Sequence, residues 1–134
     1  MSFWFWLNII LLLVLLAMLA NWAYYQFMSK RFATLLEVDE FKAGMRKAQV
    51  IDVREKKEFD SGHILGARNI PYPMLMQSLA SIRKDQPVYL YDTRIALSTR
   101  AAKKLRKKGY QNIFILKEGF DGWTGKTKGK KYDE

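Results

Sequence analysis

The chain of 134 residues contains no cysteine and a single histidine, His63. It therefore has no disulfide, no thiolate nucleophile and no cysteine ligand for a metal. With one histidine, a Cys–His pair and a histidine-based metal cluster are also excluded. We accordingly expect no metal site and no cofactor.

Charged side chains are absent from the first 29 residues, so the whole net charge of +10 falls after Ser29. The segment from Phe3 to Met28 is almost wholly apolar, and aromatic residues flank its aliphatic centre on both sides. Aromatic belts of this kind are typical of a transmembrane helix. Trp4 to Trp22 spans about 27 Å at the helical rise, close to the roughly 30 Å hydrocarbon core of a bilayer. Residues 1–29 are thus predicted to form a transmembrane anchor helix.

A cleaved signal peptide is the competing interpretation, but such a peptide has a basic start and a shorter apolar centre. Lys30 and Arg31 follow the apolar segment at once, whereas no charged side chain precedes it. The positive-inside bias then predicts a single-pass protein of the cell membrane with residues 30–134 in the cytoplasm. The anchor either contacts only lipid or packs on a partner helix. Asn8 and Asn21 lie on different faces of it and would find hydrogen bonds in another helix or in the interfacial water near each end.

Residues 30–125 alternate strand-like and helix-like segments, which is typical of an α/β domain with a largely parallel sheet. Strands are expected at residues 33–36, 49–53, 63–69, 87–91 and 113–116. Helices are expected at residues 39–47 with Asp39 as N-cap, at 73–82 beginning with Pro73, and at 97–108 before Gly109. Residues 126–134 are rich in Gly and Lys and are predicted to be a basic disordered tail.

Three motifs in this part resemble, in chain order, those of rhodanese-like domains. They are Ile-Asp-Val-Arg-Glu at 51–55, Gly-His-Ile-Leu-Gly-Ala-Arg-Asn-Ile-Pro at 62–71, and Leu116 with Gly119-Phe120 and Trp123, and they surround the segment 91–98. The resemblance covers nearly all of residues 30–125. It implies an α/β fold with a five-stranded, mostly parallel sheet flanked by helices, here preceded by one N-terminal transmembrane helix.

In rhodanese-like enzymes the loop after the fourth main strand runs Cys-x-x-Gly-x-Arg-Ser, and its amides form a cradle around a persulfide or an oxyanion. The resemblance aligns Asp92 with the cysteine, Ile95 with the glycine, Leu97 with the arginine and Ser98 with the serine. A carboxylate cannot replace the polarisable thiolate that accepts sulfur. We therefore expect no catalytic residue in this loop, which comprises Asp92, Thr93, Arg94, Ile95, Ala96, Leu97 and Ser98.

The substitutions also affect passive anion binding. Ile95 would be strained at a positive φ, so the amides are not expected to converge on one anion. Leu97 removes a fixed positive charge, and the charge of Asp92 repels an anionic ligand. Asp92 itself has three interpretations: a catalytic acid, a phospho-acceptor, or a cap for the next helix, which is favoured because aspartate is among the best caps. Arg94 is placed either to pair with Asp92 or to point into solvent.

The resemblance gives four residues framework roles. Asp52 and Arg54 match positions that brace neighbouring loops, and His63 matches a position that holds its loop against the sheet. A pH sensor is the alternative for His63. Trp123 is expected in the core.

Basic residues follow the anchor and are frequent in the helix expected at 97–108. A tethered basic domain is attracted to an anionic leaflet by roughly 1 kcal/mol for each Lys or Arg near the surface. A solvated helix face is the simpler interpretation, and nucleic-acid binding is not expected without a recognised binding fold. The predicted lipid-surface residues are Lys30, Arg31, Lys103, Lys104, Lys107 and Lys108.

These observations predict a membrane-anchored, catalytically inactive rhodanese-like domain that acts as a protein-interaction or regulatory module for a membrane-protein partner. The expected contact surface is the loop from Asp92 to Ser98 with the adjacent basic helix. Two alternatives stay open: an enzyme of the sulfurtransferase family, or a phosphatase on the same fold, working without a thiol, and a domain that only binds the lipid surface.

Overall fold

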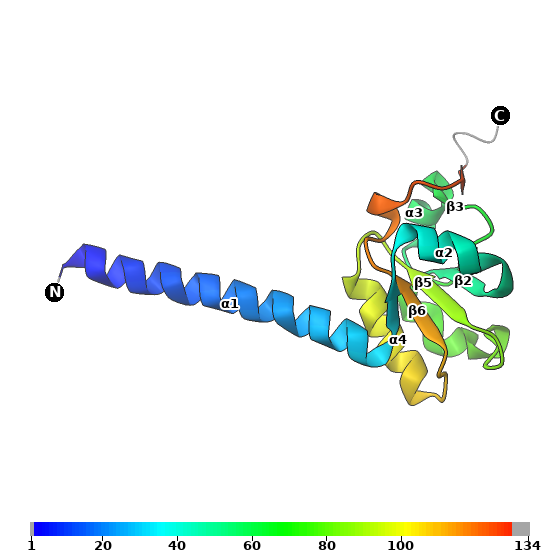
Figure 1. Ribbon diagram of the computed structural model, residues 1–134, viewed down its shortest axis with the longest axis horizontal. Coiled ribbons are helices and arrows are strands. Elements are labelled where there is room, and N and C mark those ends of the chain that lie inside the picture. Colours follow the sequence, from blue (N-terminus) through cyan, green and yellow to red (C-terminus); the bar gives the residue numbers. More distant parts are fainter. Residues whose placement is uncertain (1, 130–134) are drawn as a thin grey trace.

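The apolar N-terminal segment forms one long helix, α1 (Phe3–Phe32), that stands out from the rest of the molecule (Figure 1). The computed structural model describes residues 2–129, without the side chains of residues 28–32. Within α1, Phe3–Phe27 is long and apolar enough to cross a membrane, and none of it is buried by the domain. Signal sequences near an N-terminus share this length and composition.

The rest of the chain is built on a five-stranded parallel sheet with strand order β1-β6-β5-β2-β4. Its strands are β1 (Thr34–Leu36), β2 (Gln49–Asp52), β4 (Arg68–Asn69), β5 (Val88–Tyr91) and β6 (Ile113–Leu116). All four neighbouring pairs are parallel. All four residues of β5 are buried, as expected for a central strand covered on both faces. The predicted five-stranded parallel sheet is therefore confirmed, although the stretch expected at 63–69 contributes only β4 to it.

Two apolar clusters, one on each face, hold the sheet between helices. On one face, Leu90 and Ile51 pack with residues of α4 (Ala96–Lys107) and of η2 (Tyr72–Ser81), a 3-10 helix. On the other, Tyr89 and Tyr91 pack with Phe41 of α2 (Val38–Gly44). This second face also carries the 3-10 turns η1 (Met45–Lys47) and η3 (Phe120–Gly122). Neighbouring residues of a strand, such as Tyr89 and Leu90, belong to opposite clusters because successive side chains point to opposite faces of a sheet.

A second, two-stranded sheet joins β3 (His63–Ile64) to β7 (Thr127–Lys128) in antiparallel register, and α3 (Lys56–Ser61) precedes β3. The prediction of a disordered tail from residue 126 onward is therefore wrong for β7. Main-chain hydrogen bonds to β3 order this segment although its sequence is polar. Residues 130–134 lie outside the described residues.

Two further local predictions differ from the structure. The N-cap of α2 is Glu37 rather than Asp39, and the Glu37 amide donates a 3.0 Å hydrogen bond to Oε1 of Glu40. This reciprocal arrangement satisfies amides at the helix start. The segment after Pro71 is 3-10 rather than α-helical, with hydrogen bonds such as Met74 N to Pro71 O at 2.8 Å.

Helix α1 joins the domain without a linker. Only Ala33 separates α1 from β1, and Ala33 is itself buried in the core. The end of α1 lies against α4 (Figure 1). The C-terminal end of α1 therefore has α4 as a fixed neighbour in the domain.

Candidate functional site

The altered loop occupies the turn between β5 and α4, where the central strand of the sheet ends. Tyr91 closes β5 and Ala96 opens α4, leaving residues 92–95 as the connection. In open parallel sheets, ligands bind in the crevice outside the carboxyl ends of the strands. The loop is therefore at the edge of the sheet where this kind of fold places its chemistry.

The carboxylate of Asp92 points inward and takes the free amides at the start of α4. The Leu97 amide donates to Oδ2 at 3.1 Å, and the Ser98 amide donates to Oδ1 at 3.3 Å. The Ser98 hydroxyl donates to the same Oδ1 at 2.5 Å, and Asp92 is only 6% exposed. Asp92 thus satisfies amides at the helix start from outside, since the N-cap position itself belongs to Ile95.

Burial governs the acidity of this carboxyl. Removal from water raises the pKa of Asp92, while hydrogen bonds from the Ser98 hydroxyl and from the amides of Leu97 and Ser98 oppose that change. The pKa of Asp92 lies above its ordinary value as a result. The group is a shielded hydrogen-bond acceptor, and nucleophilic attack through it would require the loop to open.

Ile95 is accommodated without the expected strain. Its φ of −145° and ψ of −25° avoid the left-handed region, and no non-glycine residue in the described part of the chain has a positive φ. The amides still converge, but on the chain's own Asp92. Leu97 is half-buried against the core. Arg94 turns away from Asp92, and its Nε lies 3.4 Å from Oδ2 of Asp121.

Main-chain hydrogen bonds from the turn η3 hold the loop in place. The Phe120 amide donates to the carbonyl of Asp92 at 2.8 Å, and the Asp121 amide donates to that of Thr93 at 3.1 Å. Gly119, with φ of +67°, presses its backbone against the loop. A Cβ there would lie 2.5 Å from the Thr93 carbonyl oxygen and 2.4 Å from that of Arg94. The close approach requires glycine at 119.

Asp52 and Arg54 form a buried ion pair beside the loop. Nη2 of Arg54 lies 2.7 Å from Oδ2 of Asp52, and Nε donates to both carboxylate oxygens at 3.0–3.1 Å. Nη2 also donates to the Gly62 carbonyl at 2.7 Å, and the guanidinium lies 4.5 Å from the ring centroid of Phe120. Burial alone would lower the pKa of Arg54, but the hydrogen bond and charge of Asp52 outweigh it and raise that pKa. The pair ties β2 to the end of α3 and to η3.

His63 and Trp123 both make defined contacts. Nδ1 of His63 lies 2.7 Å from the Phe59 carbonyl oxygen, and the two rings stack with centroids 3.6 Å apart. Trp123 is half-buried rather than fully in the core, with its ring edge against Phe41. Its Nε1 donates to the Lys126 carbonyl at 3.2 Å.

The basic residues of α4 lie on its outer side. Lys104, Lys107 and Lys108 are exposed, and Nζ of Lys104 lies 4.7 Å from the ring centroid of Tyr72. Lys103 is half-buried. Lys30 and Arg31 lie in the last turn of α1, and their side chains are outside the described part of the structure.

A surface groove of about 480 Å³ joins the anchor to the altered loop. Trp22 and Gln26 of α1 form one wall, and Arg94, Ile95 and Asp121 form part of the other. Sequence reasoning missed this contact because the two walls are about seventy residues apart in the chain. The signal available was the short connection between the apolar segment and the first predicted strand, because it keeps the end of the helix close to the domain. Among residues 2–129, no group of three His, Asp or Glu side chains is placed to hold a metal ion.

The comparisons with known proteins agree with this geometry. A family model for the rhodanese-like domain matches residues 37–126. The uncharacterized protein YqhL of Bacillus subtilis is 52% identical over 128 residues, covering 92% of this chain and 98% of that protein. The uncharacterized protein YibN of Escherichia coli K12 is 34% identical over 83 residues, covering 60% of this chain and 58% of that protein.

A solved structure extends the similarity to a sulfurtransferase. The crystal structure of thiosulfate sulfurtransferase from Pseudomonas aeruginosa superposes with a TM-score of 0.65 at 29% identity. The match covers 72% of this chain and 20% of that one. Family match, relatives and architecture agree, and the chain belongs to the rhodanese-like domain family.

Proposed function

We propose that this chain is a membrane-anchored rhodanese-like domain that does not transfer sulfur and acts by protein contact, as an adaptor or regulator of a membrane-protein partner. One observation carries the proposal. The Asp92 carboxylate fills the amide site at the start of α4, in the position that the family motif gives to a reactive cysteine.

The filled site disfavours the chemistry of the family in two ways. The chain supplies no thiol on which a persulfide could form. An external oxyanion would also have to displace a carboxylate that is covalently tethered beside its amides, and would meet its negative charge. Loss of the thiol and occupation of the anion site both favour a role in binding other molecules.

The surface proposed for the partner surrounds the groove between α1 and the loop. Trp22 lies at the end of the apolar span and Arg94 is 82% exposed beside it, so a partner helix in the membrane can contact both. The basic side of α4 faces an anionic leaflet if the domain is cytoplasmic, as the charge bias proposes. Anchor and loop then form one continuous recognition surface.

An assay of sulfur transfer tests the inactivity. The purified full-length chain in mild detergent is given thiosulfate and cyanide, beside the Pseudomonas aeruginosa thiosulfate sulfurtransferase. We expect thiocyanate from the control alone. Thiocyanate formed by this chain above the buffer rate would overturn the proposal.

Co-purification tests the adaptor role. The full-length chain is isolated in mild detergent beside Arg94→Glu and beside a version with an unrelated transmembrane helix. We expect a stoichiometric membrane protein with the native chain and less of it with both altered versions. Its absence from the native sample, or equal recovery in all three, would contradict the proposed surface.

Binding to the lipid surface is the second candidate, and the exposed cations Lys104 and Lys107 of α4 and Lys108 at its C-cap favour it. Docking through these charges weakens steeply with ionic strength, whereas an apolar protein interface does not. Hydrogen exchange of α4 in nanodiscs, with and without anionic lipid, measures the docking directly. Protection that appears only with anionic lipid and disappears in high salt would establish this candidate.

A further inference from the structure

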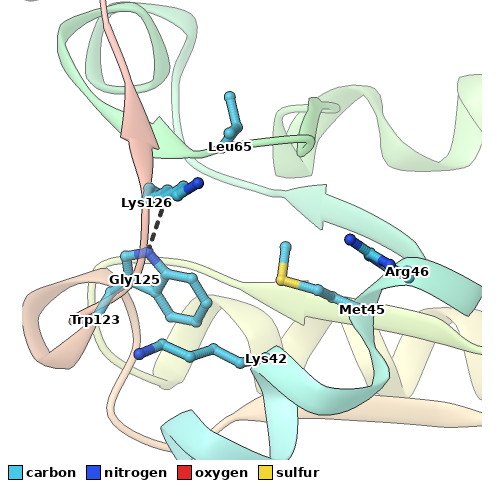
Figure 2. Close-up of a pocket in the computed structure, with 7 residues that line it drawn as sticks. All are labelled: Lys42, Met45, Arg46, Leu65, Trp123, Gly125 and Lys126. Atoms are coloured by element: carbon cyan, nitrogen blue, oxygen red, sulfur yellow. Dashed lines mark hydrogen bonds between the residues drawn. The ribbon is translucent and has the colours of Figure 1, made fainter.

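A second groove lies on the α2 side of the domain and contains no residue of the altered loop. Its volume is about 490 Å³, within the usual range for small-molecule sites. Lys42 and Arg46 come from α2 and η1, and Lys126 lies on the opposite wall beside β7 (Figure 2). Trp123, Met45 and Leu65 supply the apolar part of the lining.

The charge of this groove is of one sign. Three of its lining residues are cations and none is acidic. Among the described residues no ion pair includes Lys42, Arg46 or Lys126. Nζ of Lys42 instead donates to Oγ1 of Thr124 at 3.2 Å and lies 5.7 Å from the ring centroid of Trp123. A cleft with this lining raises the local concentration of anions.

The apolar part is held in place before any ligand arrives. Trp123 packs its edge on Phe41 and donates Nε1 to the Lys126 carbonyl, so its ring is fixed and its polar atom satisfied. The Leu65 amide donates to the same carbonyl at 3.1 Å, so Leu65 and Trp123 share one main-chain acceptor. Leu65 is nevertheless 46% exposed, one of two large apolar side chains outside α1 that are exposed in the described residues.

Gly125 makes room for the indole ring. A Cβ at this position would lie 2.4 Å from Cζ2 of Trp123 and 3.0 Å from Cε of Lys42. Any side chain at 125 must therefore displace the indole ring. The glycine keeps the aromatic wall and the cation in one arrangement.

We propose that this groove binds a small amphipathic anion, a molecule that joins a carboxylate or phosphate to a flat apolar body. The anionic group lies among Lys42, Arg46 and Lys126, and the apolar body lies on Trp123, Met45 and Leu65. Charge of a single sign selects the anion, and the fixed ring with the exposed leucine selects the apolar body. The site does not depend on the altered loop or on a membrane partner.

The test follows the indole N–H of Trp123 by NMR. The full-length chain, labelled with 15N-tryptophan, is placed in nanodiscs of zwitterionic lipid, and the Trp123 signal is assigned among the four tryptophans with Trp123→Phe. The probes are naphthalene-2-carboxylate, its neutral analogue naphthalene-2-methanol, and acetate. We expect saturable shifts of the Trp123 signal with naphthalene-2-carboxylate, and affinities weaker by about tenfold or more for the other two.

Variants locate the binding. Arg46→Gln, at an exposed position, is expected to weaken naphthalene-2-carboxylate by about tenfold, as is usual for one charge-assisted hydrogen bond. Arg100→Gln, an exposed cation on α4, is the matched control and leaves the affinity unchanged. Gly125→Ala is expected to shift the Trp123 signal before any probe is added and to weaken binding.

Several outcomes would overturn the inference. One is equal binding of the neutral analogue, and another is unchanged affinity in Arg46→Gln. A third is a non-saturating shift of all four indole signals together, which means partition of the probe into lipid. A Trp123 response to anionic lipid or to an acidic peptide, but not to the naphthalene carboxylate, would replace the small molecule with that occupant.

Discussion

Ser98 donates both its amide and its hydroxyl to one oxygen of Asp92, at 3.3 and 2.5 Å, so the first turn of α4 closes around a carboxylate from its own chain. The remaining oxygen takes the Leu97 amide. The arrangement places an internal anion where rhodanese enzymes place the group that reacts. Substitutions can remove this carboxylate, neutralise its charge, or change the residues that surround it, each separately.

Asp92→Ala is expected to lower the free energy of unfolding by about 1–2 kcal/mol, because two helix-start amides and a hydroxyl lose their acceptor. Sodium formate should recover part of this loss, since a free carboxylate can enter the vacated site. Thermal unfolding in formate against sodium chloride of equal ionic strength measures the effect. The matched control, Asp39→Ala on the exposed side of α2, should not respond to formate. An identical response to the two salts in Asp92→Ala would exclude an open anion site.

The raised pKa of Asp92 predicts a dependence on pH. The folded chain binds this proton more tightly than the unfolded chain, whose value is near 3.8. The stability from this group is therefore complete below about 3.8 and is lost as the pH rises through the folded pKa. Asp92→Asn lacks this loss, so its free energy of unfolding relative to the native chain should improve as the pH rises above about 3.8. A relative stability that falls over this interval would show that the folded pKa is lowered instead.

Arg54→Met should be strongly destabilising, by about 3–5 kcal/mol, because it leaves the charge of Asp52 buried without its partner. Asp52→Asn combined with Arg54→Met should cost less than the sum of the two single changes. Urea unfolding of the four proteins measures the coupling. Arg83→Met, which breaks the exposed pair with Asp85, is the control and should change little. Additive costs would mean that the two residues act separately.

Gly119→Ala should destabilise the domain and disturb the altered loop. A Cβ at 119 would clash with two carbonyl oxygens of the loop. The alanine would also have to adopt φ +67°, a conformation that is strained for any residue with a side chain. Gly66→Ala is a matched control, because Gly66 has φ +94° with open space around it and suffers only the backbone strain. Unfolding midpoints and hydrogen exchange at residues 92–98 compare the two. Equal effects would assign the whole cost to φ and none to the contact with the loop.

Asp92→Cys with Ile95→Gly and Leu97→Arg restores the motif of the family and should give measurable transfer of sulfur from thiosulfate to cyanide. The pinned loop and the Asp52–Arg54 pair already supply the surrounding frame. Asp92→Ser with the same two changes is the control, because it restores the loop without a thiol. Thiocyanate from the serine version, or none from the cysteine version, would count against a sound frame.

The sheet could be predicted from sequence because its strands are local patterns. Residues 88–91 and 113–116 are apolar runs bounded by turn residues, and helical spacing marks α4 between them. The type of helix at 72–81 was beyond that reasoning, since Leu75, Met76 and Leu79 suit both a 3-10 and an α-helical repeat. The pairing of β7 with β3 was also hidden, because main-chain hydrogen bonds between segments more than sixty residues apart leave little trace in side-chain pattern.

The site was predictable in position and in part of its geometry. The motif located Asp92, and the preference of aspartate for helix starts favoured the role that its contacts support. The conformation of Ile95 was not predictable, because the expectation took φ from a glycine that this chain lacks. Arg94 pairs with Asp121 of η3, which reaches the loop only through the fold.

The junction at Ala33 couples the rotation of α1 to the orientation of the domain. Since α1 passes into β1 through one buried residue, a turn of the helix about its axis swings the whole domain with it. If α1 spans a membrane as proposed, the side of α1 that meets another helix thereby decides which side of the domain faces that neighbour. The rotation of α1 about its axis would then determine whether the groove at Arg94 or the groove at Trp123 faces the neighbouring protein.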